Sequence, residues 1–249
     1  MDQHPKDWSD DINSDCSLGQ DFKVLPIEVI DFGLEDFRII WPLQREAQRG
    51  LIEGASGPKL FLGQHPPVIT LGRSAKDHSL KVSQEHLRSK GIETIEIERG
   101  GDVTYHGPGQ IVVYPIIDLR QRRTAVDWYM RSLEEVVLRT LKAFDIKGFR
   151  VQGRTGVWTE AVQYGRPPTA KKIASIGVRL SRWCTMHGFS LNITEEIHSG
   201  FELIHPCGME GVEVTSLREE ASREQQFTLS EGKAVIVSEF CNVFNYRRV

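Results

Sequence analysis

Between two apolar runs, the chain reads Glu98-Arg99-Gly100-Gly101-Asp102-Val103-Thr104-Tyr105-His106-Gly107-Pro108-Gly109-Gln110. The run before it, residues 92–97, alternates apolar and polar residues, and the run after it, residues 111–117, is rich in β-branched residues. Both patterns predict strands. The four glycines between them allow sharp bends and a close approach of a ligand to the backbone. The stretch is longer than a plain hairpin turn, so it is either a ligand-binding loop or a bulged connection.

Length, charge and cysteine usage narrow the class of protein. A chain of 249 residues forms one large domain or two small ones. The net charge of −3 provides no general attraction to nucleic acid or a membrane surface. No apolar run approaches the roughly 20 residues of a spanning helix, and the polar N-terminus is unlike a secretory signal. With four widely spaced cysteines and no disulfide framework, we expect a cytoplasmic protein that binds neither nucleic acid nor membrane.

The remaining pattern predicts one folded domain after a disordered tail. Residues 1–20 are polar, with five aspartates, and residues 21–249 are expected to form a single domain. Strands and helices do not alternate regularly, which favours an α+β fold with a mixed or antiparallel sheet. The expected strands are 24–30, two within 59–71, 154–158, 172–180 and 185–193. The expected helices are 34–52, with Pro42 in its first turn or at a kink, then 82–89, 126–144, and one from a capping box at Thr228 to Phe244.

Two residues far apart in the chain are candidates for chemistry. Cys207 lies between a proline and a glycine, as in an exposed loop, and is either a reactive thiol or an ordinary one. Lys172 opens an apolar strand, and its amine either reaches solvent or favours the thiolate of a nearby cysteine. Cys184 and Cys241 lie in apolar surroundings and are expected in the core.

Histidines add a weaker signal. His106 and His187 each precede a glycine, and each is either structural or part of a site. No HxxxH or CxxC spacing is present, so no metal site is expected.

At these residues the chain resembles the LipB-type octanoyltransferases, also called lipoyl(octanoyl) transferases. The resemblance covers roughly residues 25–217 and rests on three motifs in order. These are the stretch from Arg99 to Gln110; Lys172-Ile173-Ala174-Ser175-Ile176-Gly177-Val178-Arg179 with His187-Gly188-Phe189-Ser190-Leu191-Asn192; and Pro206-Cys207-Gly208 with Val214-Thr215-Ser216-Leu217. Met209 and His205 stand where the family often has aliphatic residues.

The resemblance implies a fold, an activity and a site. The fold would be a mixed β-sheet flanked by helices, as in the catalytic domains of biotin protein ligases and lipoate ligases. The enzyme would move an octanoyl group from octanoyl-acyl carrier protein to a lysine of lipoyl domains, in the glycine cleavage H protein and the acyltransferase subunits of 2-oxoacid dehydrogenases. It would need no cofactor. The family's nucleophile falls on Cys207 and its thiol-activating lysine on Lys172. The substrate-binding segments fall on Arg99, Gly100, Gly101, Asp102, Val103, Thr104, Tyr105 and His106, on Ser175, Ile176 and Gly177, and on Gly188, Phe189 and Ser190.

Other readings of the sequence stay open. An ATP-dependent lipoate-protein ligase has the same fold without needing the cysteine, and an amidotransferase has the same chemistry with another donor. A non-catalytic acyl-binding module would need neither Cys207 nor Lys172. The turn that holds Arg120, Arg122 and Arg123 is either a docking patch for the acyl carrier or a solvated basic turn.

Overall fold

The computed structural model describes residues 22–161, 169–206, 211–222 and 228–249. The predicted tail, the predicted loop at 163–170 for the most part, and Cys207 therefore lie outside the described residues. Within those ranges, nine strands form a mixed sheet in the order β12-β1-β2-β6-β10-β9-β8-β7, with β11 beside β9. The strands are β1 (Leu25–Leu34), β2 (Lys59–Gln64), β6 (Gln110–Ile116), β7 (Gly148–Val151), β8 (Arg154–Ala161), β9 (Thr169–Ser181), β10 (Cys184–Asn192), β11 (Glu213–Val214) and β12 (Tyr246–Arg248).

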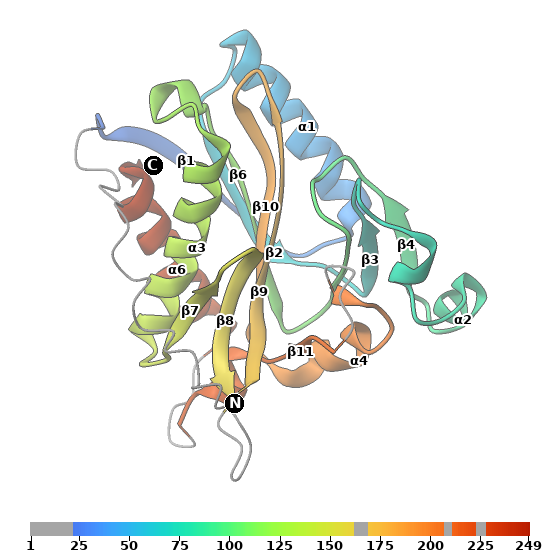
Figure 1. Cartoon of the computed structure of the whole chain (residues 1–249). Coiled ribbons are helices and arrows are strands. Elements are labelled where there is room, and N and C mark those ends of the chain that lie inside the picture. Colours follow the sequence, from blue (N-terminus) through green and yellow to red (C-terminus); the bar gives the residue numbers. More distant parts are fainter. Residues whose placement is uncertain (1–21, 162–168, 207–210, 223–227) are drawn as a thin grey trace.

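A second, small sheet lies beside the large one (Figure 1). It contains β3 (Val68–Leu71), β4 (Glu93–Glu96) and β5 (Val103–His106) in the order β4-β3-β5. The chain passes between the sheets through Gln64-His65-Pro66-Pro67, after β2, and through Gly107-Pro108-Gly109, after β5. The two strands that flank the glycine-rich stretch therefore belong to different sheets.

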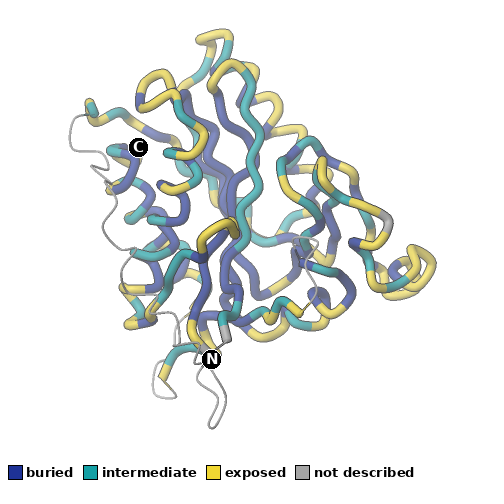
Figure 2. The backbone as a smooth tube through the Cα atoms, in the orientation of Figure 1, coloured by how far each residue is buried: buried dark blue, intermediate teal, exposed yellow. Residues whose placement is uncertain are grey.

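Helices cover both faces of the large sheet (Figure 1). On one face, α3 (Val126–Ala143) and α6 (Leu229–Phe244) pack on a buried cluster that includes Val113. On the other, α1 (Phe37–Glu53) packs on a cluster that includes Val112. Neighbouring residues of a strand point to opposite faces, so β6 supplies both cores, and its whole length is buried (Figure 2). The shorter helices are α2 (Gln84–Ser89), α4 (His198–Phe201) and α5 (Leu217–Glu220).

Local signals place the long helices largely where the sequence predicts them. The side chain of Asp36 accepts a hydrogen bond from Arg38 N at the start of α1, and Gly54, with φ +72°, ends it. The capping box of Thr228 and Glu231 opens α6 as predicted. Pro42 lies inside α1 beyond the first turn, where its ring removes one backbone donor.

Strands β5, β7 and β12 were not predicted. The stretch from Glu98 to Gln110 is not one loop, because β5 lies within it and pairs with β3 at Val68↔His106 and Ile69↔Tyr105. Its β-branched and aromatic residues favour a strand, but the glycines on both sides obscure so short a run. Strand β7 pairs with β8 and is equally short.

The hairpin of β9 and β10 carries the second motif. Arg182 and Trp183 form its two-residue turn with φ of +49° and +65°, the conformation of a type I′ turn. The resulting register places Gly177 opposite Gly188 and Ser175 opposite Ser190. The hairpin thereby brings two of the predicted substrate-binding segments side by side.

Candidate active site

A narrow cavity of about 60 Å³ lies between the glycine-rich segment and the β9–β10 hairpin. All of the predicted substrate-binding residues except Gly100 and Tyr105 line it. Pro206, which directly precedes Cys207 in sequence, also lines it. The full lining consists of Phe37, Ile97, Arg99, Gly101, Asp102, Val103, Thr104, His106, Tyr114, Ser175, Ile176, Gly177, His187, Gly188, Phe189, Ser190 and Pro206.

The two exceptions have structural roles. The backbone N–H of Gly100 donates to the carbonyl of Val178 over 2.8 Å and ties the glycine-rich segment to β9. Tyr105 is buried in a separate core, with its ring centroid 5.9 Å from that of Phe201. Tyr105 does not line the cavity, in contrast to the expectation from the sequence.

The paired glycines of the hairpin allow the cavity walls to approach. A Cβ on Gly177 would lie 3.0 Å from both Cδ of Arg99 and the carbonyl oxygen of Gly100. A Cβ on Gly188 would lie 2.1 Å from the carbonyl oxygen of Val113. A side chain at Gly177 would displace the glycine-rich segment, and one at Gly188 would displace β6, which explains why glycine suits both positions.

Arg99 places a buried positive charge at the cavity wall. Its guanidinium donates to the carbonyl and the hydroxyl of Thr70 over 2.7 and 3.0 Å. It also donates to the carbonyl of Gly100 over 3.1 Å, so the arginine side chain stabilises the backbone of the glycine-rich segment. A buried guanidinium with these acceptors is both anchored and desolvated.

The neighbouring Glu98 gathers several donors. Trp41 Nε1, Arg45 Nε and Arg179 donate to its carboxylate over 3.1, 2.9 and 3.1 Å. Burial alone raises the pKa of Glu98, but the hydrogen bond from Arg45 and the nearby charges outweigh it, so the pKa falls below its ordinary value. A carboxylate beside the cavity therefore remains ionised.

Three buried histidines surround the site. His65 contacts the carbonyl of Glu35 through Nδ1 at 2.6 Å and the hydroxyl of Tyr114 through Nε2 at 2.9 Å. His106 Nδ1 lies 2.7 Å from Gln110 Oε1. Burial lowers the pKa of His65 to about 4 and the pKa of both His106 and His187 to about 3. All three are neutral at physiological pH, when each ring carries one N–H.

His187 differs from the other two in its surroundings. It has φ +58° within a strand, and its backbone N–H donates to Gln44 Oε1 over 3.1 Å. Its buried Nε2 has no hydrogen-bond partner among the described residues and lies 4.0 Å from Glu98 Oε2. The sequence left open whether His187 is structural or part of a site. It did not indicate that Phe37, Ile97 and Tyr114 line the cavity.

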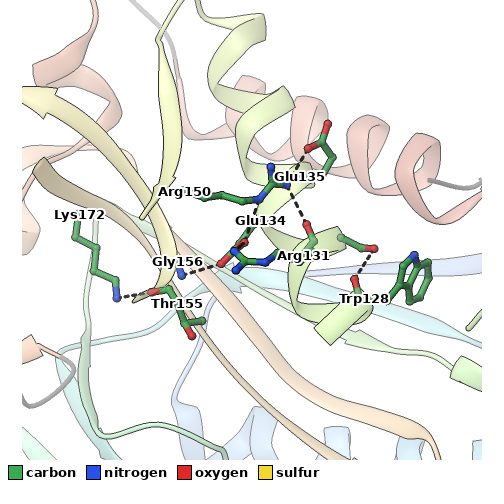
Figure 3. Close-up of polar contacts among 9 residues, drawn as sticks. Trp128, Arg131, Glu134, Glu135, Arg150, Thr155, Gly156 and Lys172 are labelled. Carbon is green, nitrogen blue, oxygen red and sulfur yellow. Dashed lines mark hydrogen bonds and ion pairs between the residues drawn. The ribbon is translucent and has the colours of Figure 1, made fainter. Parts of the chain in front are cut away.

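Lys172 lies on β9 outside the cavity lining. Its side chain is buried, and its Nζ donates to the carbonyl of Thr155 over 3.0 Å (Figure 3). The same Nζ lies 5.2 Å from the ring centroid of Trp158. Ser175 of the cavity is three residues further along the same strand, about 10 Å away. Of the two alternatives for this lysine, the one in which its amine reaches solvent is excluded by its burial.

The segment that contains Cys207 has described residues on both sides. Before it, Pro206 is buried and lines the cavity. After it, β11 pairs with β9, with Val214 opposite Lys172. Cys184 is fully buried and Cys241 packs against the core, as predicted, and burial raises the pKa of both thiols.

One of the three arginines in the possible docking patch is not exposed to a partner. Arg122 is buried, donates to the carbonyl of Phe244 over 2.7 Å and lies 4.1 Å above the ring of Tyr246. It stabilises the end of α6 and is not available to a partner. Arg120 is exposed but donates to Asp118 over 2.8 Å, which leaves a weaker basic patch than predicted.

The described ranges hold neither a cluster of metal-binding side chains nor a helix suited to span a membrane. No group of three His, Cys, Asp or Glu side chains there is placed to bind a metal ion. None of the helices described is long and apolar enough to cross a membrane.

Comparison with known proteins gives consistent results. The sequence matches the family of lipoyl protein ligase A/B catalytic domains over residues 36–241. It is 45% identical over 186 residues to an octanoyltransferase of Parabacteroides distasonis, covering 75% of this chain and 81% of the relative. It is 44% identical over 214 residues to an octanoyltransferase of Acidobacterium capsulatum, covering 81% and 85%.

Solved structures agree on the fold. A putative lipoate protein ligase from T. acidophilum with bound lipoic acid has a TM-score of 0.64 at 11% identity, covering 91% of this chain and 88% of that one. Lipoate-protein ligase A bound with ATP has a TM-score of 0.61 at 12% identity, covering 91% and 90%. Identities this low support only the fold, which confirms the predicted α+β class with a mixed sheet flanked by helices.

Proposed function

The chain belongs to the family of lipoyl protein ligase A/B catalytic domains, and on that premise we propose that it is an octanoyltransferase of lipoate biosynthesis. The identity of 39–45% to octanoyltransferases over most of the chain supports this activity. The donor is an octanoyl-acyl carrier protein and the acceptor is a lysine of a lipoyl domain. We further propose the glycine cleavage H protein and the acyltransferase subunits of 2-oxoacid dehydrogenases as the proteins that carry those domains.

The proposed nucleophile is Cys207 and the proposed activating residue is Lys172. One observation carries this assignment. Pro206, next to Cys207 in sequence, lines the cavity formed by the glycine-rich segment, while Val214, seven residues after Cys207, pairs with Lys172. Free cysteine has a pKa near 8.5, and a nearby ammonium raises the thiolate fraction at neutral pH.

The reaction then proceeds in two half-reactions. The Cys207 thiolate attacks the carbonyl of the octanoyl thioester, the bond to the carrier's phosphopantetheine sulfur breaks, and the released thiolate takes up a proton. The ε-amine of the acceptor lysine next attacks octanoyl-Cys207, forming the amide and releasing the Cys207 sulfur. Lys172 stabilises the Cys207 thiolate as an ammonium and gives its proton to the departing pantetheine thiolate. The neutral amine that results then accepts the proton of the attacking lysine.

The cavity provides a site for the acyl chain in this proposal. Part of the cavity wall is apolar and consists of Val103, Ile176 and Phe189. Gly177 allows the glycine-rich segment to pack directly on the hairpin beside this cavity.

Intact mass measurement after mixing with octanoyl-acyl carrier protein tests the proposal. We expect the protein to gain one octanoyl group and to lose it when a lipoyl domain is added. Cys207→Ala, which leaves no nucleophile at this position, should abolish the mass gain, and Cys241→Ala should leave it unchanged. An octanoyl adduct on the Cys207→Ala variant would refute Cys207 as the nucleophile while leaving the transferase activity itself intact.

A further inference from the structure

One peptide group connects Lys172 to the opposite side of the sheet (Figure 3). The carbonyl of Thr155 accepts from Lys172 Nζ over 3.0 Å. The N–H of the same peptide, on Gly156, donates to Glu134 Oε1 over 3.2 Å. In a trans peptide the C=O and N–H point in opposite directions, so the lysine and the glutamate hold this peptide from its two sides.

Glu134 is well suited to hold the peptide firmly. It lies on α3, and its side chain is only 2% exposed. Its other carboxylate oxygen accepts from Arg131 over 2.7 Å and from Arg150 over 3.1 Å. Both arginines reach solvent, so the buried carboxylate has charge-assisted partners on one side and the Gly156 N–H on the other.

The backbone at Gly156 requires such support. Its φ of +113° is a conformation that favours glycine. A Cβ there would lie 2.5 Å from the carbonyl oxygen of Ala174 and 3.0 Å from Lys172 Cε, and the β8–β9 register shifts between Val157 and Trp158. The peptide has left the regular ladder, so its orientation depends on Glu134 and Lys172.

We propose that Glu134 is a positioning residue for Lys172, acting through the Thr155–Gly156 peptide. The carboxylate fixes the direction of the peptide, and the peptide carbonyl then holds the Lys172 ammonium in place. The inference rests on the proposed role of Lys172 in activating the Cys207 thiol. Glu134 lies across the sheet from the substrate cavity and does not line it, so it acts only through the lysine.

The pH dependence of Cys207 alkylation tests this proposal in the full-length protein, without any substrate. Lys172→Ala should raise the alkylation midpoint by ~1 pH unit or more. Glu134→Met removes the acceptor of Gly156 N–H at similar volume and should raise the midpoint in the same direction. Loss of a negative charge acting only through space would lower the midpoint, so the sign of the shift separates the two effects.

Matched variants sharpen the test. Glu134→Gln keeps an acceptor oxygen for Gly156 N–H and should restore the wild-type midpoint. Glu135→Met is the control, because Glu135 lies next to Glu134 and accepts from Arg150 but not from Gly156; it should not move the midpoint. If Glu134→Met fails to fold, Glu134→Asp takes its place, since it keeps the charge but is one methylene too short to reach Gly156.

The outcomes distinguish this inference from the proposed function. In the Lys172→Ala background, Glu134→Met should cause no further shift. A shift for Lys172→Ala with none for Glu134→Met or Glu134→Asp would overturn the role of Glu134 alone. The absence of a shift in Lys172→Ala would overturn the role of Lys172, and with it this inference. Octanoyl transfer itself is measured separately by intact mass.

Discussion

At the scale of single residues, the neutral histidines make the protein sensitive to acid. The pKa of His65 is lowered by burial to about 4, and the pKa of His106 and His187 to about 3, against 6.5 in the unfolded chain. Between those values the unfolded state binds more protons than the folded state. The free energy of unfolding therefore falls as the pH drops below about 6.5, and each histidine contributes to that fall down to its folded pKa.

His106→Asn should reduce this dependence. An asparagine amide can still donate to Gln110 but does not titrate, so the variant should lose about 2 kcal/mol less than wild type between pH 7 and pH 5. Urea unfolding at the two pH values measures the difference. His86→Asn, at an exposed position on α2, is the control and should behave like wild type. An equal loss in His106→Asn and wild type would show that His106 is protonated in the folded state.

At the scale of elements, the β9–β10 hairpin and the glycine-rich segment meet at Gly177. Gly177→Ala places a Cβ within 3.0 Å of Arg99 and of the Gly100 carbonyl, so the segment must shift by a few tenths of an ångström. We expect the rate of acyl-enzyme formation to fall about tenfold, since small misplacements in an active site are costly. Stopped-assay mass spectrometry measures that rate. Gly57→Ala, where a Cβ meets nothing within 4 Å, should keep the wild-type rate; equal rates for the two variants would argue against a close approach at Gly177.

The sequence predicted those elements whose own residues carry a strong signal. The capping box at Thr228, the β9–β10 hairpin and the apolar stripe of α3 are local patterns, and all three lie where expected. Strand β5 was missed because its partner β3 lies 32 to 38 residues earlier in the chain, from Leu71↔Val103 to Val68↔His106. Arg122 was misassigned because its burial depends on Phe244 and Tyr246, at the other end of the chain.

Part of the site could also be predicted from the sequence, because its residues lie in recognisable local motifs. The resemblance placed the glycine-rich segment and the hairpin together, and the structure lines one cavity with both. The contact of Lys172 with the Thr155 carbonyl could not be predicted, and neither could that of Glu134 with Gly156 N–H, since both lie beside an irregular point in the β8–β9 pairing. The roles of Cys207 and Lys172 themselves stay predictions.

At the scale of the whole molecule, the fold alone does not decide between transfer and ligation, because lipoate ligases share it. We expect no release of pyrophosphate when the protein is mixed with lipoate and ATP, and full octanoyl transfer without ATP, since the donor thioester is already activated. A coupled pyrophosphate assay, run beside the intact-mass assay on one preparation, measures both. Pyrophosphate release dependent on lipoate would identify a ligase instead.

The Thr155–Gly156 peptide has a practical consequence. Its amide proton is enclosed against a carboxylate, and its carbonyl accepts a hydrogen bond from the lysine on the other side. Deuterium should therefore replace this proton slowly in the resting protein, and faster whenever the lysine departs. A single backbone signal in a nuclear magnetic resonance spectrum thus becomes a sensor of whether the Lys172 amine is in place.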